Sequence, residues 1–218
     1  MRVDRLPHKA CCTPLWGSEI VNRVRKGGHS TLATPTEHTV RMGIEKLQTV
    51  FRGKIITVNI ETVRLPNGHV ADLEIIHHPG GAAVVAIDAQ QRVCLLRQYR
   101  HAAGGWIWEL PAGKLEPHEP PLETARRELV EEAGREASEW VSLGAYVSSP
   151  GVFTETVHLF MARGLQSVKM AHEDAELIEV HWVRMAEACQ RALNGDLVDG
   201  KSALGLLRAQ ARLSGSAK

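Results

Sequence analysis

GKLEPHEPPLETARRELVEEAG, residues Gly113 to Gly134, combines a helical pattern with a concentration of acidic side chains. Pro120 and Pro121 suit the first turn of a helix, where a missing N–H costs nothing, and Gly134 suits its end. Between them, apolar residues recur at spacings of three and four, which gives a stripe that can pack on a core: Leu122, Ala125, Leu129 and Ala133. The pattern predicts a helix that packs by this stripe and carries its acids on the opposite face.

The acids of this helix are crowded toward its C-terminal end. Glu128, Glu131 and Glu132 share one face, with neighbouring Cβ atoms about 5–6 Å apart. Like charges at that spacing repel, and the negative end of the helix dipole adds to the repulsion. Mg²⁺ binds through a few carboxylates together with waters and substrate phosphates. The stretch therefore predicts a Mg²⁺–phosphate site, whereas a lone glutamate triplet would more often be a solvated helix face.

The spacing of the whole stretch resembles the signature of the Nudix hydrolases. Gly113 is followed after five residues by Glu119, and after seven more by Arg127-Glu128-Leu129-x-Glu131-Glu132-x-Gly134. Members of that family split pyrophosphate linkages of nucleoside diphosphates joined to a second group. The position after Gly134 is normally aliphatic and is Arg135 here, which bears on packing at the helix end more than on chemistry.

Three further segments resemble the ADP-ribose pyrophosphatase branch of this family, over roughly Phe51 to Val183. They are Arg97-Gln98-Tyr99-Arg100-His101, the run Trp108 to Gly113, and the Ser149-Pro150-Gly151 turn. The resemblance implies hydrolysis of ADP-ribose to AMP and ribose 5-phosphate. Two alternatives stay open: a pyrophosphatase for another nucleotide sugar such as GDP-mannose, or a non-hydrolytic Nudix domain that senses ADP-ribose.

Candidate substrate-binding residues lie just before the acidic helix and in the later turn. Arg97 and Arg100 are cations at a predicted strand end, where a diphosphate would need guanidinium partners; surface salt bridges are the simpler alternative. Glu109 is a carboxylate in an apolar strand, and buried acids are rarely without a role. By resemblance, Glu109 lies beside the metal site and Pro150 belongs to the substrate-binding turn.

The resemblance also implies a metal set. Two or three Mg²⁺ ions, or Mn²⁺, would be held by Glu128, Glu132 and the carbonyl of Ala112, with Glu131 as a further candidate. The ions would bridge the diphosphate and lower the pKa of a bound water.

Acids in a loop such as His172-Glu173-Asp174-Ala175-Glu176 are usually only solvated, but the resemblance implies that a glutamate here is a further metal ligand or the catalytic base. Glu176 is the best match for the residue that deprotonates the water, and Glu173 and Asp174 are its rivals. Glu131 and Arg127 complete the predicted catalytic residues. Arg127 would hold the motif together through Glu123 or Glu119 rather than touch substrate.

Composition sets wider bounds on the protein. Its 218 residues are 44% hydrophobic, which is enough for one good core. Residues 1–41 carry 7 Lys/Arg and 3 Asp/Glu, which leaves 19 and 22 for the remainder, so the body is mildly acidic and no nucleic-acid footprint is visible. Four cysteines without metal-ligand spacing fit a reducing cytoplasm. No apolar run approaches the roughly 20 residues that span a bilayer.

The order of elements predicts an α/β protein: a Nudix-type α/β/α sandwich with a mixed sheet, preceded by a small antiparallel β layer. We expect residues 1–46 to be a disordered extension, 47–80 a β-hairpin layer, and 81–218 the Nudix domain. The resemblance implies that the β-hairpin layer forms a homodimer; a monomeric extension of the sheet is the alternative. Residues 1–41 could be a transit peptide, or translation could begin at Met42. Asn67-Gly68 is expected to be the turn of a first hairpin, and Ala82 to Ile87 and Val93 to Arg97 to form a second hairpin-like pair. Trp106 and Trp108 are expected to fill the core, with stacking of one of them on adenine as the alternative.

Overall fold

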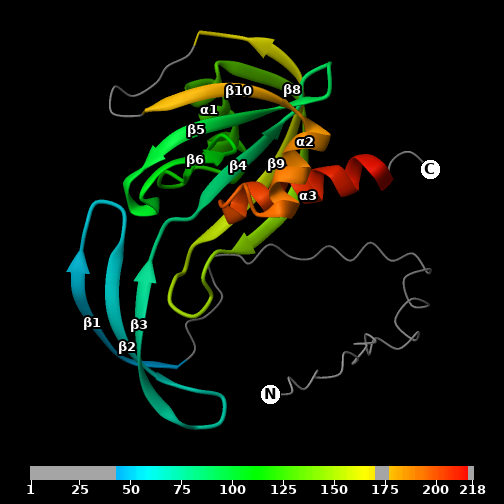
Figure 1. Ribbon diagram of the computed structural model, residues 1–218. Coiled ribbons are helices and arrows are strands. Elements are labelled where there is room, and N and C mark those ends of the chain that lie inside the picture. Colours follow the sequence, from blue (N-terminus) through cyan, green and yellow to red (C-terminus); the bar gives the residue numbers. More distant parts are fainter. Residues whose placement is uncertain (1–42, 170–176, 216–218) are drawn as a thin grey trace, which may run out of the picture. The chain divides into compact units, whose positions relative to one another are not determined.

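The computed structural model describes residues 43–169 and 177–215, and its first layer is an antiparallel sheet in the order β1-β2-β3 (Figure 1). Its strands are β1 (Ile44–Arg52), β2 (Thr57–Arg64) and β3 (Val70–His77). The predicted hairpin around Asn67-Gly68 is confirmed by the β2–β3 pairing. Strand β1 was missed, because every side chain after Ile44 is exposed and no alternation of buried positions marks it.

Two further sheets form the body of the fold. A four-stranded mixed sheet has the order β7-β4-β9-β8 and a three-stranded antiparallel sheet has the order β10-β5-β6. Their strands are β4 (Gly81–Ala86), β5 (Arg92–Arg100), β6 (Gly105–Glu109), β7 (Ala112–Lys114), β8 (Arg135–Val147), β9 (Thr156–Ser167) and β10 (Ile178–Arg184), with a 3₁₀ turn η1 (His101–Ala103) between β5 and β6.

The expected hairpin between Ala82–Ile87 and Val93–Arg97 is wrong. The two strands lie in different sheets and share only the isolated bridge between Ile87 and Val93. Both edges of β4 are taken by other strands, since β7 pairs on one side and β9 runs parallel on the other. An apolar run buried on both faces reads the same in sequence whichever neighbour it takes.

Helices cover both faces of these strands, which confirms the α/β/α sandwich with a mixed sheet. Helix α1 (Pro121–Ala133) packs on Ala82, Val84 and Ala86 of β4, whereas α2 (Met185–Asn194) and α3 (Gly200–Gly215) pack in the cluster that contains Val85 and Ile87. Because side chains alternate along a strand, β4 supplies both cores. In Figure 1, α2 and α3 lie in front of the strands and α1 behind them.

The remaining features concern the edges of the fold. The first sheet is joined to the loop after β8 by Ile76, whose N–H donates to the Val152 carbonyl at 2.7 Å and whose carbonyl accepts from Thr154 at 3.0 Å. Trp108 packs against the core, but Trp106 is 42% exposed, so the expectation that both fill the core is half wrong. Among the described residues, no helix has the length and apolar composition needed to cross a bilayer.

Candidate active site

Helix α1 presents two buried carboxylates at the face of β4 and β7. Its apolar stripe packs as predicted, and Gly134 ends the helix in the left-handed conformation. Glu128 and Glu132 are only 8% and 3% exposed, so they point inward rather than to solvent. Residues four apart on a helix lie one above the other, which brings both acids to the same place.

Strand β7 meets these two carboxylates at Ala112 and Gly113. The N–H of Ala112 donates to Glu132 Oε2 at 2.8 Å. A Cβ on Gly113 would lie 1.8 Å from Glu128 Oε1, so the Glu128 carboxylate rests directly on this glycine. Two neighbouring residues of β7 therefore fix the positions of both acids, and only glycine allows the second approach.

Arg127 gathers three of the motif's glutamates. Its Nε and Nη2 donate to the two oxygens of Glu119 at 3.0 and 3.1 Å. Its Nη1 donates to Glu128 Oε1 at 2.7 Å and to Glu131 Oε2 at 3.0 Å. Of its two predicted partners, Glu119 is the one in contact; Glu123 bonds to a neighbouring arginine instead.

These contacts shift pKa values in the cluster. The hydrogen bond from Arg127, with smaller ones from Thr124 and from the main chain of Glu116, lowers the pKa of Glu119 from 4.5 to about 2. The reciprocal hydrogen bond to Glu119 raises the pKa of Arg127 above its ordinary value. The pair therefore stays charged throughout the pH range in which proteins work.

Replacing Arg127 by methionine is expected to lower the free energy of unfolding by about 2–3 kcal/mol, less than the roughly 3–5 kcal/mol for fully buried pairs. Three carboxylates would lose their common cation, while the apolar stem is kept. Because folding lowers the pKa of Glu119, its contribution is present above pH 4.5 and is lost as the pH falls toward 2. Urea unfolding at several pH values should therefore show that the difference in unfolding free energy between the wild type and Arg127→Met becomes smaller below pH 4.5. A difference that is independent of pH would contradict this account.

A cavity of about 660 Å³ opens beside these acids. It brings together half of the predicted site residues, from strands β5 to β7 and helix α1: Arg100, Glu109, Ala112, Glu128 and Glu132. On its wall, Arg100 Nε donates to Glu109 Oε2 at 2.6 Å, and Glu109 is 3% exposed. Cations and carboxylates thus face one space, which suits a ligand that carries both phosphates and metal ions.

Of the predicted site residues that the structure describes, four do not line this cavity: Arg97, Arg127, Glu131 and Pro150. Glu131 lines a different pocket together with Glu119 and Arg127. Arg97 points away, pairs with Glu179 at 3.4 Å and lies 5.3 Å from the centre of the Trp106 ring. Pro150 lies in an exposed turn next to Ser148, which does line the cavity. Glu173, Asp174 and Glu176 lie outside the described residues.

The sequence analysis missed several residues of this cavity. Lys201 comes from the first turn of α3, Asp199 lies just before that helix, and Tyr146 comes from β8. Burial, with smaller contributions from Asp199 and Glu155, raises the pKa of Tyr146 to about 12, which keeps the phenol neutral. A single lysine in the first turn of a helix gives no local signal, because its partner lies 92 residues earlier in the chain.

The donor set fits a hard divalent cation. Glu128 and Glu132 are buried carboxylates that open on the cavity, and a main-chain carbonyl such as that of Ala112 is a common third ligand for such ions. Within residues 43–169 and 177–215, no group of three or more His, Cys, Asp or Glu side chains is arranged to hold a metal. The set would therefore need a main-chain oxygen, or an acid from residues 170–176, which lie outside the described part of the chain.

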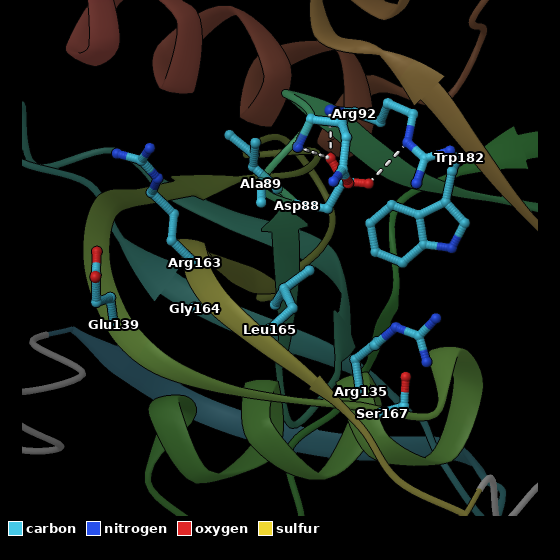
Figure 2. Close-up of a pocket in the computed structure, with 12 residues that line it drawn as sticks. Asp88, Ala89, Arg92, Arg135, Glu139, Arg163, Gly164, Leu165, Ser167 and Trp182 are labelled. Atoms are coloured by element: carbon cyan, nitrogen blue, oxygen red, sulfur yellow. Dashed lines mark hydrogen bonds and ion pairs between the residues drawn. The ribbon is translucent and has the colours of Figure 1, made fainter.

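A second pocket, of about 530 Å³, lies away from the acidic helix face (Figure 2). Two of its three arginines already have partners: Arg92 donates to Asp88 at 2.8 Å, and the guanidinium of Arg135 lies 5.5 Å from the centre of the Trp182 ring. Figure 2 shows Arg135 extending toward Trp182. The departure from the motif at Arg135 is thus accommodated by stacking on an aromatic ring, and its Nη1 also donates to the Gly134 carbonyl at 3.0 Å.

Comparisons with known proteins identify similar sequences and a similar fold. A sequence model of the NUDIX domain matches residues 77–202. The chain is 37% identical over 175 residues to an ADP-ribose pyrophosphatase of Mycobacterium tuberculosis, an alignment that covers 78% of this chain and 84% of that protein. It is 33% identical over 141 residues to a GDP-mannose pyrophosphatase of Klebsiella pneumoniae, over 60% of this chain and 71% of that protein. The crystal structure of an ADP compounds hydrolase shares the fold, with a TM-score of 0.69 at 22% identity over 79% of this chain and 94% of that one.

Proposed function

The chain belongs to the Nudix family of pyrophosphatases, and on that premise we propose that it hydrolyses ADP-ribose to AMP and ribose 5-phosphate with Mg²⁺ or Mn²⁺ as cofactor. The observation that carries this proposal is the cavity in which buried Glu128 and Glu132 face Arg100. Two acids with an opposed guanidinium are what a metal-bound diphosphate needs.

The residues of the cavity have separate tasks in this proposal. Glu128, Glu132 and the Ala112 carbonyl would hold the metal, with Glu131 as an outer candidate because it lines another pocket. When bound, the metal supplies Lewis-acid charge stabilisation for the diphosphate and lowers the pKa of water. Arg100 would bind diphosphate oxygens, and Arg127 would keep the acids in place through Glu119.

Hydrolysis needs a base for the attacking water. We assign this role to Glu176, with Glu173 and Asp174 as rivals from the same loop. Water adds its oxygen to one phosphorus, its proton passes to the carboxylate, and the P–O–P linkage breaks with the electrons on the leaving phosphate. Arg97, which pairs with Glu179, and Pro150 would act at the edge of the substrate site rather than at the reacting atoms.

A homodimer formed through the first sheet is part of the proposal, as is a cytoplasmic setting without nucleic-acid or membrane partners. The support for a dimer is a set of exposed apolar side chains on that sheet: Leu47, Val50, Phe51 and Leu73, each 38% to 55% exposed. An exposed apolar surface on a sheet with open edge strands favours pairing with another chain. We also propose that the chain is divided into a β layer at 47–80 and a catalytic domain at 81–218.

The proposal is tested by product analysis on the full-length protein. With Mg²⁺, ADP-ribose should release AMP and ribose 5-phosphate faster than GDP-mannose releases GMP, and chelation by EDTA should abolish both reactions. Faster release of GMP would favour the GDP-mannose alternative, for which a relative exists. Binding of ADP-ribose without any turnover would instead favour a sensor.

A further inference from the structure

We infer that Lys201, which helix α3 delivers to the cavity, is a positioning residue that acts on Arg100 through Glu109. The inference rests on the proposed function, because it takes Arg100 to be the cation that receives the diphosphate. Lys201 thereby gives a role to α3, the last helix, which lies outside the signature motif.

Glu109 is the centre of this arrangement. It is 3% exposed, and each of its oxygens has one cation: Arg100 Nε at 2.6 Å on Oε2 and the Lys201 ammonium on Oε1. A buried carboxylate is tolerated only when it is paired and hydrogen-bonded. With both cations in place, the Glu109 side chain has one defined orientation, and that orientation sets where Arg100 is held.

Arg100 is held by one nitrogen only. Its Nε bonds to Glu109, whereas its two terminal nitrogens have no hydrogen-bond partner among the residues that the structure describes. The side chain is 40% exposed and lines the cavity that contains Glu128 and Glu132. A guanidinium fixed at Nε presents its other donors as a rigid fork, which matches two phosphate oxygens. Fixing it in advance removes an ordering cost from substrate binding.

Lys201 is itself fixed from the first turn of α3. Its ammonium also contacts Asp199 Oδ2 at 2.9 Å, and the same oxygen accepts the N–H of Ser202 at 3.1 Å. The Ser202 hydroxyl donates to Asp199 and accepts the N–H of Leu110 at 2.7 Å. The Ser202 hydroxyl therefore connects the first turn of α3 to Leu110, the residue that follows Glu109 at the end of β6. Lys201 already serves two carboxylates, so its role is to orient Glu109 rather than to bind phosphate itself.

The test measures binding of ADP in the presence of Mg²⁺ by calorimetry, because ADP carries the diphosphate without the sugar bond to be cut. Lys201→Met is expected to weaken ADP binding about tenfold, which corresponds to about 1.4 kcal/mol. Lys201→Arg, which keeps the charge, should restore most of that loss. Lys46→Met, an exposed lysine on β1 outside the cavity, is the matched control and should bind as the wild type does.

The double variant separates positioning from a merely structural role. In an Arg100→Met background, Lys201→Met should weaken ADP binding by less than about twofold, because the group through which it acts is gone. The same tenfold loss in both backgrounds, or wild-type affinity in a folded Lys201→Met, would overturn the inference. If Lys201→Met does not fold, Lys201→Gln is read by the same criteria.

Failure of the inference is distinguishable from failure of the proposed function. A wild-type protein that binds ADP but releases no AMP from ADP-ribose would overturn the substrate assignment and leave the double-variant test of Lys201 decisive. A wild type that hydrolyses ADP-ribose, with ADP affinity unaffected by Lys201→Met, would overturn only the role of Lys201. A wild type that binds no ADP at all would overturn both.

Discussion

Replacing Glu132 by glutamine is expected to lower kcat about 10³-fold, because the several kcal/mol that a metal supplies to the transition state depend on its ligand charge. The fold should persist. Glutamine has the same shape, and its oxygen can still accept the Ala112 N–H that Glu132 accepts at 2.8 Å. Since Glu132 is 3% exposed, removing its charge also removes a desolvation cost. Initial rates over a range of Mg²⁺ concentrations, with thermal unfolding of both proteins, provide the measurement.

Glu123→Gln is the matched control for this variant. Glu123 lies on the same helix but does not line the cavity with Glu132, and its carboxylate pairs with Arg126 at 3.0 Å on the surface. An exposed ion pair contributes little to stability, and Glu123 lies outside the cavity, so kcat should stay within about twofold of the wild type. If Glu132→Gln kept full activity and an unchanged Mg²⁺ dependence, Glu132 would have no part in a metal site.

The contiguous part of the site could be predicted from sequence because one helix carries it. The apolar stripe through Leu129 fixes which face of α1 is buried, and the spacing of Glu128 and Glu132 then brings both acids to one place. Because two neighbouring carboxylates repel each other, the pair indicates a bound cation. Glu131 shows the limit of this reasoning: one residue of rotation puts it in a different pocket, which Arg127 also lines.

Features that depend on distant pairing could not be predicted in the same way. Lys201 meets Glu109 across 92 residues, and no periodicity in either segment indicates the other. Only the resemblance to the family, which favours Arg100, separates Arg97 from Arg100 in the sequence. Three residues along a strand place the two side chains on opposite faces, so only Arg100 reaches the cavity. The wrong hairpin between β4 and β5 has the same cause, because strand partners are set by the whole sheet.

Gly113→Ala is expected to lower kcat by roughly 10²-fold and to cost about 1–3 kcal/mol of unfolding free energy, the usual range for overpacking. The added Cβ would lie 1.8 Å from Glu128 Oε1 and 2.1 Å from its Cδ, so the carboxylate must leave its position. A displaced carboxylate no longer faces the cavity that it shares with Glu132. The variant should therefore also bind Mn²⁺ more weakly, which calorimetry can measure.

Two comparisons isolate this effect from a general glycine effect. Gly215→Ala is the control, because a Cβ there meets nothing within 4 Å; its activity should be unchanged. In a Glu128→Gln background, Gly113→Ala should cost little further activity, because the group that it displaces has already lost its charge. Equal losses in both backgrounds would mean that Gly113 acts on catalysis by another route, such as movement of β7. A loss confined to the wild-type background would instead tie the requirement for glycine to the carboxylate that rests on it.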